Sequence, residues 1–226
     1  IRSKDREVYI VTPERGVHKL RGNDVARQIV EFAIRRANTR HFKTVVESDK
    51  DLPRRFLNEF AQLRAISKLL FSKKLMTPFY AGSKSSHGSL GLRVKGGFLI
   101  TSRGSNKEDL SDEDIVLVSR VDWRRREIKV VGVANAKASL NAPLFQKIYD
   151  EFPSVNGIVH THSFDKKFPS TEFAETPGTL EYALAPIDVL KKFAAVNLNK
   201  HGLIAIGPDI VTAVSTILKP KVVRGN

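Results

Sequence analysis

The stretch Gly157-Ile158-Val159-His160-Thr161-His162-Ser163 decides how this chain of 226 residues is interpreted. Its apolar start is typical of a buried β-strand, and strand residues two positions apart project from the same face of a sheet. His160 and His162 therefore share a face, while Thr161 points to the opposite side. The pattern predicts two ligands of a metal site. Taken alone, it fits a purely structural pair of histidines equally well.

A second stretch, Lys200-His201-Gly202-Leu203-Ile204-Ala205-Ile206-Gly207, places His201 directly before another apolar strand. We expect His201 to be the third ligand. Three neutral imidazoles leave one coordination position open, as in catalytic zinc sites, and the absence of cysteine excludes thiolate ligands and disulfides. The sequence therefore predicts zinc or a similar divalent ion, which would polarise a carbonyl group and stabilise an enediolate.

The surrounding segments alternate irregularly between strand and helix patterns. Apolar runs predict strands at 7–13, 41–47, 90–94, 97–101, 115–119, 127–133, 157–162 and 203–206. Helical spacing predicts helices at 23–36, 54–70, 143–151, 180–196 and 208–218. Hairpin-type links among the strands favour a layered α/β domain with a largely antiparallel sheet. The polar segment 49–53 indicates a linker, so we divide the chain into an extension, 1–52, and a domain, 53–226.

Six short motifs occur in an order that resembles the class II aldolase and adducin family, which includes fuculose-phosphate aldolase and the pentulose-phosphate 4-epimerases. They cover nearly three quarters of the chain, and their residues are Gly88–Arg93, Gly97–Gly104, Leu110–Val116, Ala142–Pro153, Gly178–Glu181 and His201–Leu203. The resemblance implies a three-layer α/β/α fold around a largely antiparallel sheet. It also implies a metal-dependent lyase or epimerase, a tetramer, and metal binding by His160, His162 and His201.

The chain departs from the family pattern at the position of the acid/base carboxylate. Family members carry a glutamate or aspartate before the helix that precedes the histidine strand, and Asn141 stands there. An amide does not ionise near neutral pH, so Asn141 cannot serve as a general base. The resemblance assigns binding of a small anionic, phosphorylated substrate to the turns that carry Gly88, Ser89, Arg103, Gly104 and Ser139, and Arg103 also replaces a small hydroxyl residue.

Three functional hypotheses stay open. The first is an aldolase-type lyase or epimerase acting on a small phosphorylated sugar or hydroxy acid. The second is a non-catalytic pseudoenzyme with a structural or binding role in a larger assembly that contains RNA or lies in an organelle. The third is a metal enzyme of different chemistry, such as a decarboxylase or dehydratase. The three retained histidines favour a metal-using enzyme, and Asn141 favours the second hypothesis.

The net charge of +14 is concentrated toward the N-terminus, where residues 1–75 hold 18 Lys and Arg against 9 Asp and Glu. A basic segment of this kind attracts nucleic acid or an acidic protein, although a solvated surface is the simpler interpretation. No apolar run reaches the roughly 18 residues needed to span a bilayer. We expect a cytoplasmic protein or, alternatively, one of the mitochondrial or another organellar matrix. Because the first residue is Ile1, we also expect the natural chain to begin upstream.

Overall fold

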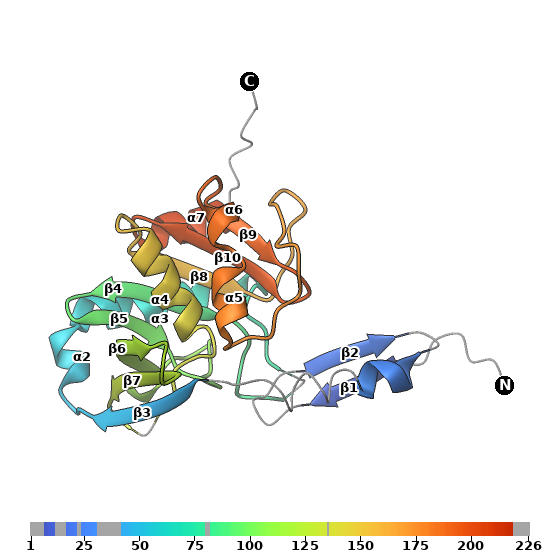
Figure 1. The fold of residues 1–226 in the computed structure, drawn as a ribbon. Helices are drawn as coiled ribbons and strands as arrows, with labels where there is room; N and C mark the ends of the chain where they lie inside the picture. Colours follow the sequence, from blue (N-terminus) through green and yellow to red (C-terminus); the bar gives the residue numbers. More distant parts are fainter. Residues whose placement is uncertain are drawn as a thin grey trace.

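A computed structural model describes residues 7–11, 17–21, 24–30, 42–79, 82–134 and 136–218 (Figure 1). Its centre is an eight-stranded sheet in the order β3-β7-β6-β5-β4-β8-β10-β9. The strands are β3 (Lys43–Ser48), β4 (Ser89–Val94), β5 (Gly97–Thr101), β6 (Ile115–Asp122), β7 (Glu127–Gly132), β8 (Gly157–Thr161), β9 (Ala195–Leu198) and β10 (Gly202–Gly207). Only the pair β3 and β7 is parallel among these described strands, so the predicted, largely antiparallel sheet is confirmed.

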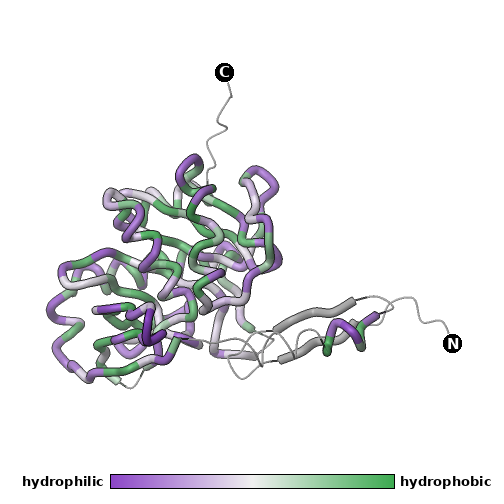
Figure 2. Tube along the Cα trace, in the orientation of Figure 1, coloured by the Kyte–Doolittle hydropathy of each residue, from purple (hydrophilic) through white to green (hydrophobic). Residues whose placement is uncertain are grey.

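Helices cover both faces of this sheet and complete the three-layer α/β/α fold (Figure 1). They are α2 (Leu52–Arg55), α3 (Leu57–Ser72), α4 (Ala142–Glu151), α5 (Leu180–Leu184), α6 (Ile187–Leu190) and α7 (Ile210–Leu218), with a 3₁₀ turn, η1, at Asp112–Asp114. Two hydrophobic cores result. One joins the sheet to α4, α5 and α6, and the other joins it to α3 and α7. Apolar residues accordingly concentrate in the strands (Figure 2).

The strands supply side chains to both cores because consecutive strand residues face opposite sides. In β8, Ile158 packs in the core beneath α4, and Val159 packs in the core beneath α3. All residues of β8, β9 and β10 are buried. His160 lies on the same side as Ile158, so the histidines occupy the sheet face that α4 and α5 cover.

The N-terminal residues contribute to two sheets. β1 (Glu7–Val11) and β2 (Val17–Arg21) form a separate antiparallel pair. β3, which lies inside the segment 1–52, pairs with β7 at the edge of the main sheet. Of the helix predicted at 23–36, residue 24 forms a turn and residues 25–30 are helical, and residues 23 and 31–36 lie outside the described residues.

The single helix predicted over 180–196 is wrong. The chain forms two short helices, α5 and α6, and then the buried strand β9. Pro186 stands between the helices and lacks the N–H that a continuous helix would require. The apolar run Ala195–Leu198 pairs with β10. A short buried run of this length fits helix and strand equally well by its periodicity.

The helices within the described ranges are too short or too polar to cross a membrane.

Candidate metal centre

The antiparallel register of β8 and β10 brings the three predicted ligands together. Ile204 lies opposite His160, and Leu203 lies opposite Thr161, so His201 falls just beyond the strand end beside His162. Gly202 makes this approach possible. Its φ is +149°, and a Cβ atom there would lie 2.1 Å from the carbonyl oxygen of Thr161. A residue with a side chain would therefore separate the two strands at the point where the histidines meet.

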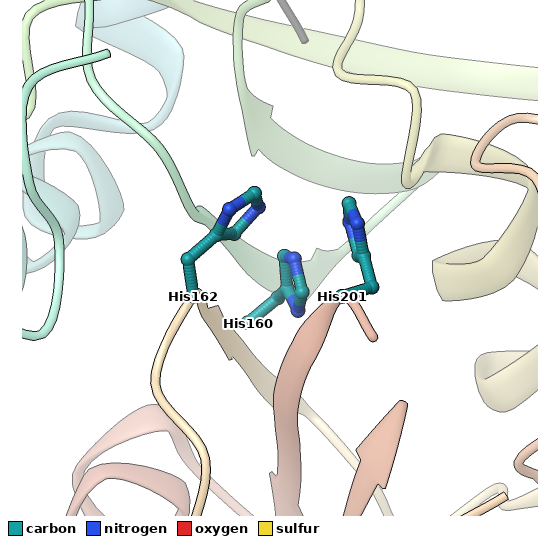
Figure 3. Close-up of side chains that lie close together, drawn as sticks. All are labelled: His160, His162 and His201. Atoms are coloured by element: carbon teal, nitrogen blue, oxygen red, sulfur yellow. The ribbon is translucent and has the colours of Figure 1, made fainter. Parts of the chain in front are cut away.

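The three imidazoles offer ligand atoms that all lie within 4.8 Å of one another (Figure 3). The ring centroids are 5.1 Å apart for His160 and His162, 5.0 Å for His160 and His201, and 4.6 Å for His162 and His201. His160 is fully buried, His201 is half-buried, and His162 has an exposed edge. The cluster is thus closed on the side of the sheet and accessible from the side of His162.

The hydrogen bonding of His160 fits a metal ligand. Its Nδ1 lies 3.2 Å from the carbonyl oxygen of Leu203, which accepts a hydrogen bond only if Nδ1 carries the proton. The lone pair is then on Nε2, which is buried and has no hydrogen-bond partner among the described residues. A backbone carbonyl that fixes the tautomer in this way is the usual arrangement around a metal-binding histidine. The residues present therefore fit a divalent ion.

The electrostatics of the cluster keep the imidazoles neutral. Burial, followed by the charges of His162 and His87, lowers the pKa of His160 well below its usual value, and the bond to Leu203 opposes this only partly. Burial among neighbouring rings, followed by the charge of His201, lowers the pKa of His162 in the same direction. Neutral imidazoles are the form that binds metal.

These shifts predict that the metal-free protein loses stability as the pH falls below about 6.5. Below that value the unfolded chain takes up protons on its histidines while the folded chain does not, so protonation favours unfolding. His87, whose pKa burial lowers to about 4, adds to the effect. Thermal unfolding from pH 7 to pH 4.5 should show a falling midpoint, with a smaller decrease in the variant His87→Phe. A midpoint equally pH-dependent in both proteins would exclude a contribution from His87.

Two residues at the site were not assigned from the sequence. The ring of His87 stacks on His162 at a centroid distance of 4.2 Å, and its centroid lies 4.5 Å from that of the Phe79 ring. The ring of Tyr182 meets His201 edge-on at 5.5 Å. His87 lies on a serine-rich turn that carries no metal-site motif. Tyr182 directly follows the Gly178–Glu181 motif, and this adjacency was the available signal.

Asn141 occupies a fixed position at the N-terminus of α4. Its Oδ1 accepts a hydrogen bond of 2.8 Å from the Tyr182 hydroxyl, and its Nδ2 donates one of 2.9 Å to Ser89 Oγ. All three side chains are buried. Burial raises the pKa of Tyr182 well above its usual value, so the hydroxyl keeps its proton. This hydrogen-bonded row connects the metal cluster to the first residue of β4.

The predicted anion-binding residues fall on neighbouring loops. Ser89 lies opposite His160 in the sheet, and Ser139 Oγ accepts a hydrogen bond from the backbone N–H of Asn141. The φ of Gly88 is +90°, and a Cβ atom there would lie 2.8 Å from the carbonyl oxygen of His160. Gly88 therefore allows the serine turn to pass close to the histidine strand.

The loop that carries the other two predicted residues is joined to the loop of Ser139. A bridge between Ser102 and Ala138 connects them, and the backbone N–H of Arg103 donates to the carbonyl of Lys137. Gly104 has a φ of +75°. The guanidinium of Arg103 is half-buried, and its Nε has no hydrogen-bond partner among the described residues. A half-buried guanidinium whose Nε–H is buried without a partner is suited to binding an anion.

Known proteins share this architecture. Residues 61–172 match the family described as Class II Aldolase and Adducin N-terminal domain. L-fuculose-1-phosphate aldolase from Thermus thermophilus superposes with a TM-score of 0.53 and 21% identity, over 70% of this chain and 87% of that one. Sugar-phosphate aldolase from Thermotoga maritima gives a TM-score of 0.57 and 19% identity, over 73% and 90%. At these identities the superpositions establish the fold alone.

A comparison with the sequences of known proteins also finds a sugar-phosphate enzyme. Methylthioribulose-1-phosphate dehydratase from Leptospira biflexa is 23% identical over 137 residues, which are 61% of this chain. The aligned part spans 62% of the length of that relative. Fold and site define a class II aldolase-like domain with a three-histidine cluster. The chain belongs to the class II aldolase and adducin family.

Proposed function

We propose that this protein is a metal-dependent lyase or epimerase that acts on a small phosphorylated sugar or hydroxy acid. The observation that carries the proposal is the buried Nε2 of His160, which has no partner among the described residues and belongs to a cluster with His162 and His201 whose ligand atoms lie within 4.8 Å of one another. Burying a polar nitrogen without a partner is unfavourable, and a bound cation removes that cost. The related aldolases and the dehydratase support a sugar-phosphate substrate.

The roles of the residues follow from their positions. His160, His162 and His201 would hold a divalent ion, most simply zinc, which supplies a Lewis acid that polarises a substrate carbonyl and stabilises an enediolate. Arg103, with the backbone of Gly88 and Gly104 and the hydroxyls of Ser89 and Ser139, would bind the anionic end of the substrate.

Neither Asn141 nor Tyr182, the two polar side chains joined beside the histidines, is suited to proton transfer. Asn141 does not ionise, and Tyr182 keeps its proton because it is buried. Asn141 is therefore suited to orienting a ligand through its amide and not to accepting a proton. A decarboxylase or dehydratase that uses the ion without the usual base is the second enzymatic candidate, and the dehydratase relative favours it. Asn141 in place of the usual carboxylate also favours a non-catalytic role. Measuring the metal content of the protein separates that role from the two enzymatic candidates.

Restoring the carboxylate tests this assignment. Asn141→Glu should create or raise aldol cleavage by about 100-fold or more, because a positioned general base contributes roughly 10²–10⁴-fold to the rate. Release of the aldehyde product from ketose 1-phosphates, measured with zinc-loaded protein, gives the result. Asn141→Gln is the matched control, since it has the same length but no ionisable group. No gain with any ketose phosphate would exclude a latent aldolase.

The remaining parts of the proposal concern assembly and location. The class II aldolase relatives support a homo-oligomer, and we propose a tetramer with sites between subunits. The basic charge of residues 1–75 supports attraction of nucleic acid or an acidic protein. A cytoplasmic or organellar-matrix compartment completes the proposal.

A further inference from the structure

The loop after β5 carries two desolvated cations that lack an ion-pair partner. Lys107 is fully buried, and burial lowers its pKa to about 8, so the amine is still mainly protonated at pH 7. Its Nζ donates to Ser105 Oγ, and none of the ion pairs within 4.0 Å in the described parts of the chain includes Lys107. Arg103 has its Nε buried without a partner on the same loop. Burying a charge is unfavourable unless an opposite charge lies close to it, and the carboxylate that acts on Lys107, Asp114, forms no direct ion pair with it.

Holding the loop together does not require the ammonium group. The backbone N–H of residue 107 donates to Ser86 Oγ, and its carbonyl accepts from Ser67 Oγ. Any amino acid supplies these backbone contacts. The Asp114 carboxylate, whose charge favours protonated Lys107, is itself bound by the N–H and hydroxyl of Ser111. The positive charge of Lys107 is therefore offset only by a carboxylate beyond ion-pair distance that already accepts two other hydrogen bonds.

The position of Lys107 connects it to the metal cluster. Ser86, which contacts residue 107, directly precedes His87, and the ring of His87 stacks on His162. The charge of Lys107 acts on both of these imidazoles. Within the described residues, the charges that shift the pKa values of His87, His160 and His162 come from other histidines and Lys107, and none comes from a carboxylate. In low dielectric surroundings a fixed charge attracts a ligand over several ångströms without touching it.

We propose that Lys107 is a specificity-determining charge that, with Arg103, selects ligands bearing an oxyanion group beside the three histidines. The proposal rests on the proposed function in placing the ligand at this cluster. Two protein cations without a direct ion pair, together with a histidine cluster that would hold a divalent ion, suit a ligand with more than one negative charge. A phosphate monoester or a phosphorylated hydroxy acid meets this requirement, whereas a neutral sugar does not.

Anion binding by wild-type protein and two variants tests the proposal. Lys107→Met removes the buried charge and keeps a side chain of similar length. Lys95→Met is the control, because it removes an exposed charge at the opposite end of β4. Metal-free protein is titrated separately with inorganic phosphate and with acetate, and the rise in unfolding temperature gives the affinity. We expect Lys107→Met to bind at least about tenfold more weakly than wild type, because a full charge is lost in a low-dielectric site. Lys95→Met should bind like wild type.

The two anions distinguish the source of the oxyanion. Stabilisation by phosphate alone indicates a phosphoryl group, and stabilisation by acetate as well indicates a carboxylate. Equal affinities in wild type and Lys107→Met, or no anion binding by wild type, overturn the proposal. If Lys107→Met does not fold, the side-chain NMR resonance of buried Lys107 in wild type replaces it, and a resonance that phosphate leaves unmoved overturns the proposal.

Failure of this proposal is separable from failure of the proposed function. Metal content is measured on the same preparations before the metal is removed. Lys107-dependent phosphate binding in a protein that takes up no metal would contradict the enzyme assignment and support the anion site. Metal binding with phosphate affinity indifferent to Lys107 would support the metal centre and overturn the anion site.

Discussion

Replacing His160 with alanine is expected to abolish metal binding. The wild-type protein should contain about one divalent ion per chain, and the affinity of the variant should fall by more than about 100-fold. Loss of a partner that only orients a ligand already costs roughly 10–100-fold, and His160 is the most buried member of the cluster with the orphaned nitrogen. Mass spectrometry of the native protein, together with zinc titration of the metal-free form, measures both quantities.

His87→Phe is the matched control for this experiment. It keeps an aromatic ring against His162 and removes the imidazole that lies outside the three-histidine cluster. Its metal content should equal that of wild type. A folded wild-type protein that takes up no divalent ion would contradict the metal site. Loss of metal in His87→Phe would instead make His87 part of the ligand set.

The substitution Gly202→Ala should destabilise the protein by at least about 3 kcal/mol. A φ of +149° is essentially restricted to glycine, and the added Cβ would lie 2.1 Å from the carbonyl oxygen of Thr161 and 2.9 Å from the Cα of His162. Both obstacles are backbone atoms, which cannot move aside without opening the β8–β10 pair. The loss is a large share of the roughly 5–15 kcal/mol that stabilises a typical domain.

Denaturant unfolding followed by circular dichroism measures this loss. Gly82→Ala is the control, since Gly82 also has a positive φ, +82°, but no heavy atom lies within 4 Å of the Cβ that would be added. It should cost only about 1 kcal/mol, the strain of the backbone alone. Equal losses in the two variants would mean that the close contact with Thr161 does not govern stability.

Most of the sheet was predictable because its strands are short apolar runs bounded by turns. The hairpin of β4 and β5 and the strands β6, β7, β8 and β10 occur where the sequence places them. The region after Gly178 was misassigned, because Ala195–Leu198 is buried at every position and its periodicity does not separate a buried strand from a helix. Pairing with β10, a tertiary interaction, decides between them.

The histidine cluster was predictable in a way that its surroundings were not. The alternation of His160 and His162 is local, and His201 adjoins a recognisable apolar strand. Tyr182 and His87 reach the site through the packing of the fold. The spacing of these residues along the chain does not predict their contacts with the cluster. The burial of Lys107 without an ion pair was not predictable either, since the sequence shows a lysine in a polar loop and not its complete burial.

The parallel strand β3 bears on where this protein can be cut. Residues 43–48 precede the segment that matches the family, yet they cover the outer edge of β7 through six paired positions. A truncated chain starting at Pro53 would leave the N–H and C=O groups of β7 facing water, and such an open edge recruits strands from other molecules. Solubility of the isolated aldolase-like domain is therefore tied to a few residues that lie outside its recognisable sequence.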